Sequence, residues 1–428
     1  MSNVSNISNK VTSRSKAYLT YLVLILMLVS ILVYYTMSLP ALFPSKIAQE
    51  FLGSYSKNVQ NSLMVLGSGI ASLGFYLIII NQYFADKIGR KKVLAFNVVG
   101  LALASLLIML STNYIQYIFF MLLLYYFFSS NIWIIYIIEE TDKEKRAFYS
   151  NLIRIAGLLG FILAIIFRSI FITDTQSNWR AMMLFPIILG IPLSIIILIT
   201  LKETSTYQLM KEQESLKEKR SFKEEMRSIF QTENRKSIYA ILIISLIFGG
   251  TRITLFEKYL TDVSILTQSQ ITIIFIWTVP AALGAFLING LLADRTGRKP
   301  LFYLWAGLQP ISVITWVIGA HNSNPEYVFI IVQIGFALMQ ISFWGLLGVL
   351  SLTTIELLPT DKRAFGSGIM VLFFALGTTI GLLLSSILIL FLGLSISFII
   401  IILPTFIIIP IAYVFLKETR GVELSKIK

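Results

Sequence analysis

Three charged motifs each occur twice along the chain, and their residue types suit ion pairing rather than bond-breaking chemistry. The repeated motifs are Ala-Asp-x-x-Gly-Arg-Lys at 85–91 and 293–299, Glu seven residues before Arg at 139 and 356, and Leu-Lys-Glu-Thr at 201–204 and 416–419. Because all three return in the same order, the repeats predict two related halves.

Three arginines lie within strongly apolar segments: Arg154, Arg168 and Arg252. A charge inside a membrane span costs at least ~2.5–3.5 kcal/mol, so it usually marks a pathway or a partner. The guanidinium fork suits carboxylate, phosphate or sulfate. Arg154 and Arg252 are therefore candidates for anion binding, unless Arg154 snorkels and Arg252 is neutralised by Glu257. Arg168 lies near the outer end of its helix and is expected to snorkel to the interface.

The remaining chemistry-bearing residues argue against an enzyme. The chain has no cysteine and one histidine, His321, which stands in a short polar segment and is expected at the surface. Thiol chemistry and thiolate metal sites are excluded. No Gly-rich phosphate loop with its lysine is present, and carboxylates stand almost wholly outside the apolar segments. We expect no catalytic residues, no metal and no cofactor.

The apolar runs around these charges predict an all-α membrane protein. Hydrophobic residues make up 56% and charged residues 13% of the 428 positions, against roughly 25% charged in a soluble domain. Runs of this length can cross a hydrocarbon core of roughly 30 Å as helices. Twelve helices are predicted: 17–40, 59–83, 92–111, 115–138, 147–171, 178–201, 237–260, 267–291, 300–319, 325–354, 364–391 and 394–416.

The charge distribution predicts the domain organisation and the orientation. We expect a six-helix half at 1–201, a cytoplasmic linker at 202–236 and a second half at 237–428. The linker carries Phe222, Met226, Ile229 and Phe230 at helical spacing, which indicates either an amphipathic helix or a solvated segment. The net charge of +13 lies mostly in the predicted cytoplasmic segments, so it indicates cytoplasmic termini rather than nucleic-acid binding.

Four longer motifs stand at the ends of predicted helices: Gly-Leu-Leu-Ala-Asp-Arg-Thr-Gly-Arg-Lys at 290–299, Asn-Trp-Arg at 178–180, Glu-Leu-Leu-Pro at 356–359 and Glu-Thr-Arg-Gly at 418–421. They resemble motifs of the major facilitator superfamily, most closely those of its sugar-porter branch and organic-ion relatives. The chain departs from the pattern at Gln82 and Lys202, and 346–351 lacks a Pro- and Gly-rich segment ending in Trp. The resemblance implies twelve transmembrane helices in two pseudo-symmetric halves, working as a multi-pass cell-membrane transporter by alternating access.

The resemblance also implies a cytoplasmic gate of ion pairs. Its residues would be Asp86, Arg90, Glu139, Arg146, Glu203, Asp294, Arg298, Glu356, Arg363 and Glu418. Asp86 should face the start of helix eleven near Gly366, and Asp294 the start of helix five near Phe148. Arg90 is expected to pair with Glu139 or Glu140, Arg298 with Glu356, Arg146 with Glu203, and Arg363 with Glu418. Gly89 and Gly297 should allow tight turns. The alternative is that these charges only fix the topology.

Substrate hypotheses follow from the same comparison. Arg154 and Arg252 stand where sugar porters commonly carry a glutamine and an asparagine, so we predict a small organic anion such as a sugar acid or another carboxylate. A neutral sugar or polyol is the alternative. Further candidates for substrate contact are Asn131, Asn151, Gln340 and Trp344.

Partners and coupling are less specified by the sequence. We expect a monomer in the lipid bilayer with a small-molecule substrate. Glu257 is the one carboxylate that could titrate within the outer pathway, where an interfacial cap is the equal alternative. Proton symport, uniport and exchange all stay open. A membrane nutrient sensor without transport is the second functional alternative, although the short C-terminal segment favours transport.

Overall fold

The computed structural model describes residues 15–128, 132–141, 145–205, 207–208, 230, 234–358 and 363–420. Within these ranges the regular elements are helices joined by turns and short non-helical stretches, and an isolated antiparallel bridge joins Ile172 and Ser177. The helices of the N-terminal part are α2 Lys16–Leu42, α3 Pro44–Leu52, α4 Lys57–Ala71, η1 Ser72–Leu77, α5 Ile78–Ile88, α6 Arg90–Met109, α7 Tyr114–Phe128, α8 Ile132–Glu140, α9 Arg146–Phe171, η2 Trp179–Met183 and α10 Leu184–Thr200. Those of the C-terminal part are α13 Arg235–Gly250, α14 Phe256–Val263, α15 Gln268–Phe275, α16 Thr278–Thr296, α17 Lys299–Ala320, α18 Pro325–Leu357, α19 Arg363–Ile402, η4 Leu403–Ile407 and α20 Ile408–Phe415.

In the described part of the chain, nine helical stretches are long and apolar enough to cross a membrane. The stretch Gly366–Phe415 covers two predicted spans, because the backbone of Gly393 has φ 74° and interrupts the helix there. The spans predicted at 59–83 and 237–260 are broken into shorter pieces, by η1 and by the non-helical stretch 252–255. Every predicted span is thereby represented among the described helices.

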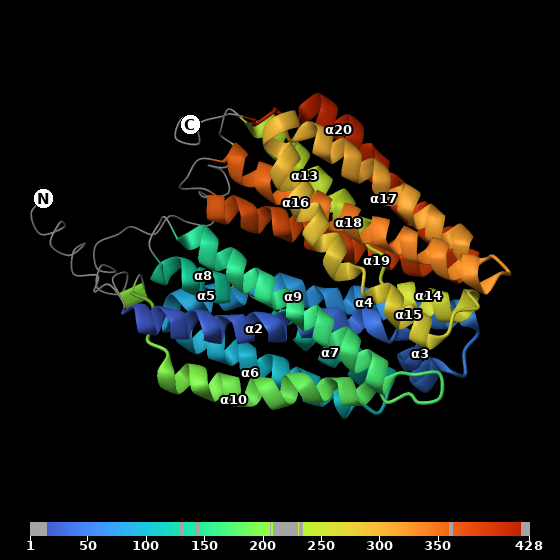
Figure 1. The fold of residues 1–428 in the computed structure, drawn as a ribbon, viewed down its shortest axis with the longest axis horizontal. Coiled ribbons are helices and arrows are strands. Elements are labelled where there is room, and N and C mark those ends of the chain that lie inside the picture. Colours follow the sequence, from blue (N-terminus) through green and yellow to red (C-terminus); the bar gives the residue numbers. More distant parts are fainter. Residues whose placement is uncertain are drawn as a thin grey trace, which may run out of the picture. The chain divides into compact units, whose positions relative to one another are not determined.

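The helices pack into two compact units. The first comprises Met1–Leu39, Gly74–Ala164 and Arg180–Lys219. Within it α6 packs against both α7 and α10, as Figure 1 shows in cyan and green. The buried core of this unit includes Leu26, Val98, Leu101 and Tyr136. Glycine at 190 lets α10 approach the side chain of Ala102 on α6.

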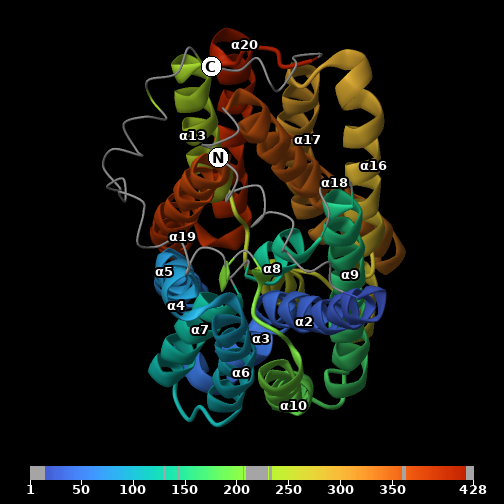
Figure 2. The ribbon, with the colours of Figure 1, turned by 90° about the vertical axis from the view of Figure 1, so that its left-hand side faces the viewer.

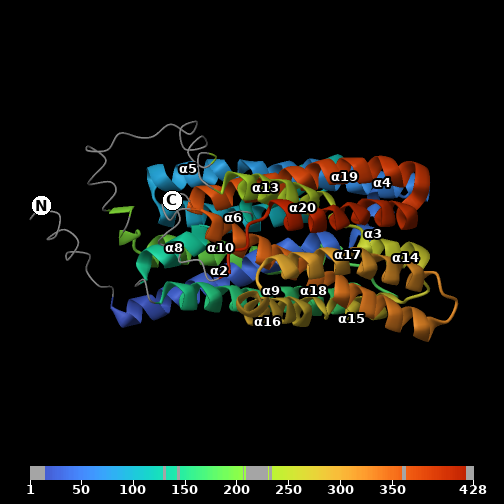
Figure 3. The ribbon, with the colours of Figure 1, turned by 90° about the horizontal axis from the view of Figure 1, so that it is seen from above.

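The second unit comprises Pro40–Leu73, Ile165–Trp179 and Arg220–Lys428. Within it α18 packs against α16 and α17, which lie beside one another in Figure 2. Helix α19 packs against α13 and also along α4, and Figure 3 shows α4 and α19 side by side. The second unit therefore combines two short stretches from the N-terminal half with the C-terminal half. The predicted domain boundaries at 201 and 237 remain a prediction.

Candidate functional site

The first repeated motif folds into a carboxylate-capped turn between α5 and α6. Gly89 has φ 105°, which only glycine adopts readily, and the next two backbone N–H groups begin α6. The backbone N–H groups of Arg90 and Lys91 donate to Oε1 of Glu203 at 2.8 and 3.1 Å. The side chain of Arg90 donates through Nε to Glu139 at 3.2 Å, and Thr204 donates to the same carboxylate at 2.6 Å. We call these six residues the first turn cluster.

The second repeated motif builds the same arrangement between α16 and α17. Gly297 has φ 95°, and the backbone N–H groups of Arg298 and Lys299 donate to Glu418 at 2.9 and 3.1 Å. Arg298 forms a two-pronged contact with Glu356, through Nε at 3.0 Å and Nη2 at 2.7 Å. The hydroxyl of Thr419 also donates to Glu356, at 2.5 Å. These six residues form the second turn cluster, and its contacts match those of the first.

Both clusters place an anionic group at the positive end of a helix. The unpaired N–H groups and the helix dipole stabilise a carboxylate there. Burial alone would raise the pKa of Glu418, but backbone N–H donors from Arg298, Lys299, Arg420 and Thr419 outweigh it and hold that pKa below its usual 4.5. The hydrogen bonds to Glu356 likewise raise the pKa of Arg298. The glutamates at 203 and 418 are thus helix caps, a role that the sequence motifs alone do not reveal.

Only some of the other predicted gate residues have side chains that the structure describes. Asp294, near the end of α16, is 80% exposed and pairs at 3.2 Å with Arg298, which directly precedes α17. Glu140 accepts hydrogen bonds from the backbone and hydroxyl of Ser205, at 2.6 and 2.9 Å. The side chains of Asp86, Arg146 and Arg363 lie outside the described residues. The pairing predicted for these three residues therefore remains a prediction.

Arg252 lies in a break in the helix predicted at 237–260. Helix α13 ends at Gly250, and α14 begins at Phe256, so Arg252 is on non-helical backbone and half-buried. The buried hydroxyl of Thr254, in the same break, has no hydrogen-bond partner within the described ranges. Membrane transporters commonly place solute sites where a spanning helix is interrupted, because the unwound backbone then offers polar groups.

Close helix packing immediately precedes this break. A Cβ added to Gly249 would stand 2.0 Å from the carbonyl oxygen of Phe374, and one added to Gly377 would stand 1.9 Å from that of Leu246. Helices α13 and α19 therefore touch backbone to backbone immediately before Arg252. Small residues allow such close crossings in membranes.

Arg154 lies on the exposed face of α9 together with Asn151, which is one turn earlier. The structure therefore leaves this arginine accessible on the surface of its helix.

The remaining predicted contact residues lie on two helices. Gln340 on α18 donates to the hydroxyl of Thr278 at 3.0 Å and so links α18 to α16. Trp344 is half-buried and packs edge-on against Phe286 and Phe343. Asn131 lies outside the described residues.

The prediction that Arg168 snorkels to the interface is wrong. Its side chain is fully buried in the second unit and donates to the carbonyl oxygens of Leu42 and Gln268, at 2.6 and 3.1 Å. Further hydrogen bonds reach the side chains of Gln268 and Thr272. A guanidinium with this many protein acceptors has no need of interfacial water.

Glu257 is also fully buried, and it is the ionic partner of Arg168 at 3.3 Å. The backbone N–H and the hydroxyl of Ser45 donate to its two oxygens at 2.8 and 2.6 Å. The alternative that Glu257 neutralises Arg252 finds no support in these contacts, since the carboxylate is engaged elsewhere. A pairing between residues 89 positions apart leaves no local pattern, so sequence reasoning missed it.

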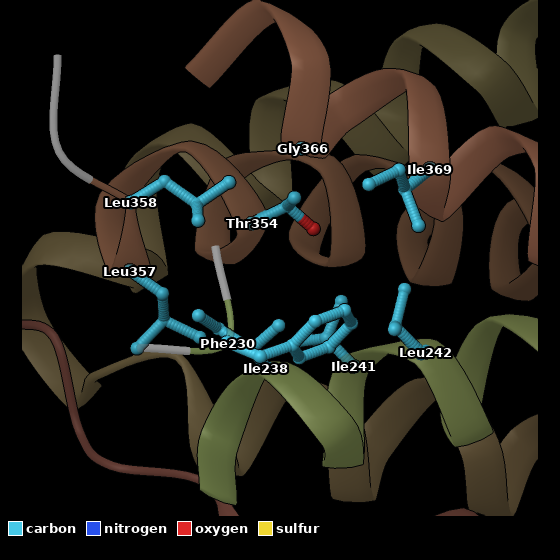
Figure 4. A pocket seen from close by; sticks show the side chains of 9 residues that line it. All are labelled: Phe230, Ile238, Ile241, Leu242, Thr354, Leu357, Leu358, Gly366 and Ile369. Carbon is cyan, nitrogen blue, oxygen red and sulfur yellow. The ribbon is translucent and has the colours of Figure 1, made fainter. Parts of the chain in front are cut away.

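An apolar pocket in the second unit is a different kind of feature. It is lined by Phe230, Ile238, Ile241, Leu242, Thr354, Leu357, Leu358, Gly366 and Ile369. Figure 4 shows Phe230 between the α13 side chains and those of α18 and α19. Phe230 also stacks on Tyr239, with ring centroids 4.9 Å apart. The described part of this lining carries no charge, which does not suit a polar solute, so we do not assign this pocket to transport.

Solved structures share this architecture. The chain resembles a D-xylose–proton symporter at 15% identity and a TM-score of 0.76, over 95% of this chain and 100% of that one. An inward-open structure of the xylose transporter from E. coli gives 15% and 0.73, over 96% and 99%. A bacterial homologue of the human lysosomal transporter Spinster gives 15% and 0.68, over 94% and 97%. A search of curated proteins gives no match.

The family assignment comes from the sequence profile of the Major Facilitator Superfamily, which matches residues 23–355. With the structural matches, it confirms the predicted all-α fold of twelve transmembrane helices in two pseudo-symmetric six-helix halves. It also identifies a multi-pass membrane transporter rather than an enzyme. The chain belongs to the major facilitator superfamily.

Proposed function

We propose that this transporter moves a small organic anion, such as a sugar acid or another carboxylate, by alternating access. The observation that supports this most directly is Arg252 on interrupted backbone between α13 and α14. A guanidinium at that point can donate two parallel hydrogen bonds to a carboxylate. The neighbouring hydroxyl of Thr254, buried without a partner in the described ranges, supplies a further polar group.

The proposal extends to the gate and the orientation. The two turn clusters fasten the ends of α6 and α17 by matching ion pairs, and we assign them the role of keeping these helix ends rigid during transport. We place both termini in the cytoplasm and the protein, as a monomer, in the cell membrane. The excess of positive charge in the predicted cytoplasmic segments supports this orientation.

Counterflow in proteoliposomes tests the substrate class. Vesicles preloaded with a carboxylate such as gluconate should accumulate the labelled compound, whereas xylose and polyols should neither exchange nor compete. Arg252→Asn should reduce carboxylate exchange by roughly 10- to 100-fold, as expected for the loss of a charge-assisted hydrogen bond. The matched control is Arg235→Asn, the same change at an exposed position at the other end of α13.

The remaining outcomes separate the alternatives. Exchange of sugars without carboxylates would refute the anion proposal and favour a neutral sugar or polyol. Binding of a solute without any exchange would favour a nutrient sensor. Arg154→Gln tests the second predicted arginine separately. Uptake driven by an imposed pH gradient would indicate proton symport, and gradient-independent exchange would indicate uniport or antiport.

A further inference from the structure

Arg168 and Glu257 form a buried ion pair that joins parts of the chain from different halves. Arg168 belongs to the last turns of α9, and Glu257 to the first turn of α14. Both side chains are 0% exposed, and both lie in the second compact unit. Ser45, which also binds the carboxylate, comes from α3 in the N-terminal half.

The contacts around this pair are polar and lie where α3, α4 and the end of α9 meet α14, α15 and α19, a boundary that we call the seam. Asp174 accepts from the backbone N–H of Gln268 at 2.6 Å, at the start of α15. Lys258 binds Asp262 at 2.8 Å, and Asn61 on α4 reaches the same carboxylate at 3.5 Å. By the predicted topology, all these residues lie towards the outer side. The outer ends of the N-terminal helices are therefore held to the C-terminal half by charges and hydroxyls.

The seam continues along α4 and α19, which run side by side in Figure 3. Ser62 and Ser386 lie 3.0 Å apart through their hydroxyl oxygens, and Ser72 and Thr379 lie 2.6 Å apart. These contacts are formed by small polar side chains, and leucines pack beside them, since Gly69 on α4 faces Leu382 and Leu383 on α19. Separating these hydroxyl pairs would expose polar groups that water can hydrogen-bond at once, which offsets part of the cost of opening.

We propose that Arg168 and Glu257 act as the outer latch of the transport cycle, closed as seen here and broken each time the outer side opens. The inference rests on the proposed alternating access. A buried ion pair is favourable only while its geometry and added hydrogen bonds are complete, and removing one partner strands a buried charge. The pair is therefore stable in two states: with all its hydrogen bonds formed when the seam is closed, or with both side chains hydrated when the seam is open.

The latch depends on the shape of the guanidinium. Arg168 reaches helix α2 through the carbonyl of Leu42, α14 through Glu257 and α15 through Gln268 at the same time. A lysine at this position would carry the same charge on one nitrogen and could not make this planar set of contacts. Charge alone would not restore the latch.

Disulfide trapping measures closure of the seam without any solute. The chain has no cysteine, so Ser62→Cys with Ser386→Cys introduces the only two thiols. Their hydroxyl spacing of 3.0 Å predicts rapid cross-linking in the closed state. Adding Glu257→Gln should slow cross-linking by roughly 5- to 150-fold, the range of typical coupling between sites. Labelling of the single Ser62→Cys variant by a membrane-impermeant thiol reagent should rise correspondingly.

Controls keep the outcome interpretable. Glu326→Gln removes an exposed carboxylate near the start of α18 and should leave cross-linking unchanged. Ser45→Ala removes one hydroxyl donor to Glu257 and should give an intermediate rate even if Glu257→Gln does not fold. Arg168→Lys should behave like Glu257→Gln.

Unchanged cross-linking in monodisperse Glu257→Gln protein would overturn the latch. Should that variant not fold, unchanged cross-linking in Ser45→Ala protein would overturn it. No solute takes part in the cross-linking experiment, so its result is independent of carboxylate transport. The latch and the carboxylate substrate can therefore each be refuted without the other.

Discussion

Replacing Gly297 by alanine should weaken the second turn cluster in two separable ways. The residue has φ 95° and ψ 175°, a region that is essentially restricted to glycine and costs other residues about 1–3 kcal/mol. The added Cβ would also stand 2.6 Å from Oε2 of Glu418. The carboxylate would have to move away from the start of α17, and losing such a helix cap costs about 0.5–2 kcal/mol. The expected loss of stability is therefore about 1.5–5 kcal/mol.

Thermal unfolding in detergent, followed by tryptophan fluorescence, measures this loss. With the usual unfolding entropy per residue scaled to this chain length, the apparent melting temperature should fall by about 2–6 °C. The matched control is Gly290→Ala on the preceding helix, where an added Cβ meets no atom of the described residues within 4 Å. That change should be neutral or slightly stabilising, because alanine favours a helix.

A double-mutant cycle separates the two contributions. In a Glu418→Ala background the carboxylate is gone, so Gly297→Ala should then cost only the backbone strain. Equal melting temperatures for wild type and Gly297→Ala would refute the argument from backbone geometry. Strict additivity with Glu418→Ala would refute the clash between the methyl group and the carboxylate.

Three further predictions concern the same unit. Arg298→Lys removes a two-pronged, charge-assisted contact with Glu356 and should lower the stability by about 1.5–3 kcal/mol. Arg295→Lys, at an exposed position, should leave the stability unchanged, and the melting curves of the two variants test this difference. Gly377→Ala places a Cβ 1.9 Å from the backbone of α13 and should abolish monodisperse protein in size-exclusion chromatography, whereas Gly368→Ala on the same helix should be tolerated. Folding lowers the pKa of Glu418, so its stabilising effect is complete above the usual pKa of 4.5 and is lost as the pH falls through the lower folded pKa. The difference in melting temperature between wild type and Glu418→Gln should therefore shrink on acidification below about pH 4.5. A difference that stays constant with pH would contradict the prediction.

Local backbone requirements could be predicted from the sequence alone. Gly89 and Gly297 were expected in tight turns, and both have positive φ. The gap predicted between 391 and 394 coincides with the interruption at Gly393. Such features are legible because they depend on one residue type and its immediate neighbours.

Helix breaks and long-range partners could not be predicted in the same way. The interruption of helix seven after Gly250 lies beside a backbone contact with α19, which an apolar run does not reveal. The burial of Arg168 depends on acceptors supplied by Leu42, Glu257 and Gln268, far away in the chain. Hydropathy reports only that a charge is costly in the membrane, not which partner compensates it.

The order of synthesis determines when each ion pair can form. Every residue of the first turn cluster precedes Ser205, so its network can close before any of the C-terminal half has left the ribosome. The second cluster must wait for Thr419, near the end of the chain. Arg168, by contrast, is made long before Glu257 and has to remain without its carboxylate partner in the meantime. A chain stalled between these two residues would carry an unneutralised arginine in the bilayer, which makes this interval the vulnerable stage of membrane insertion.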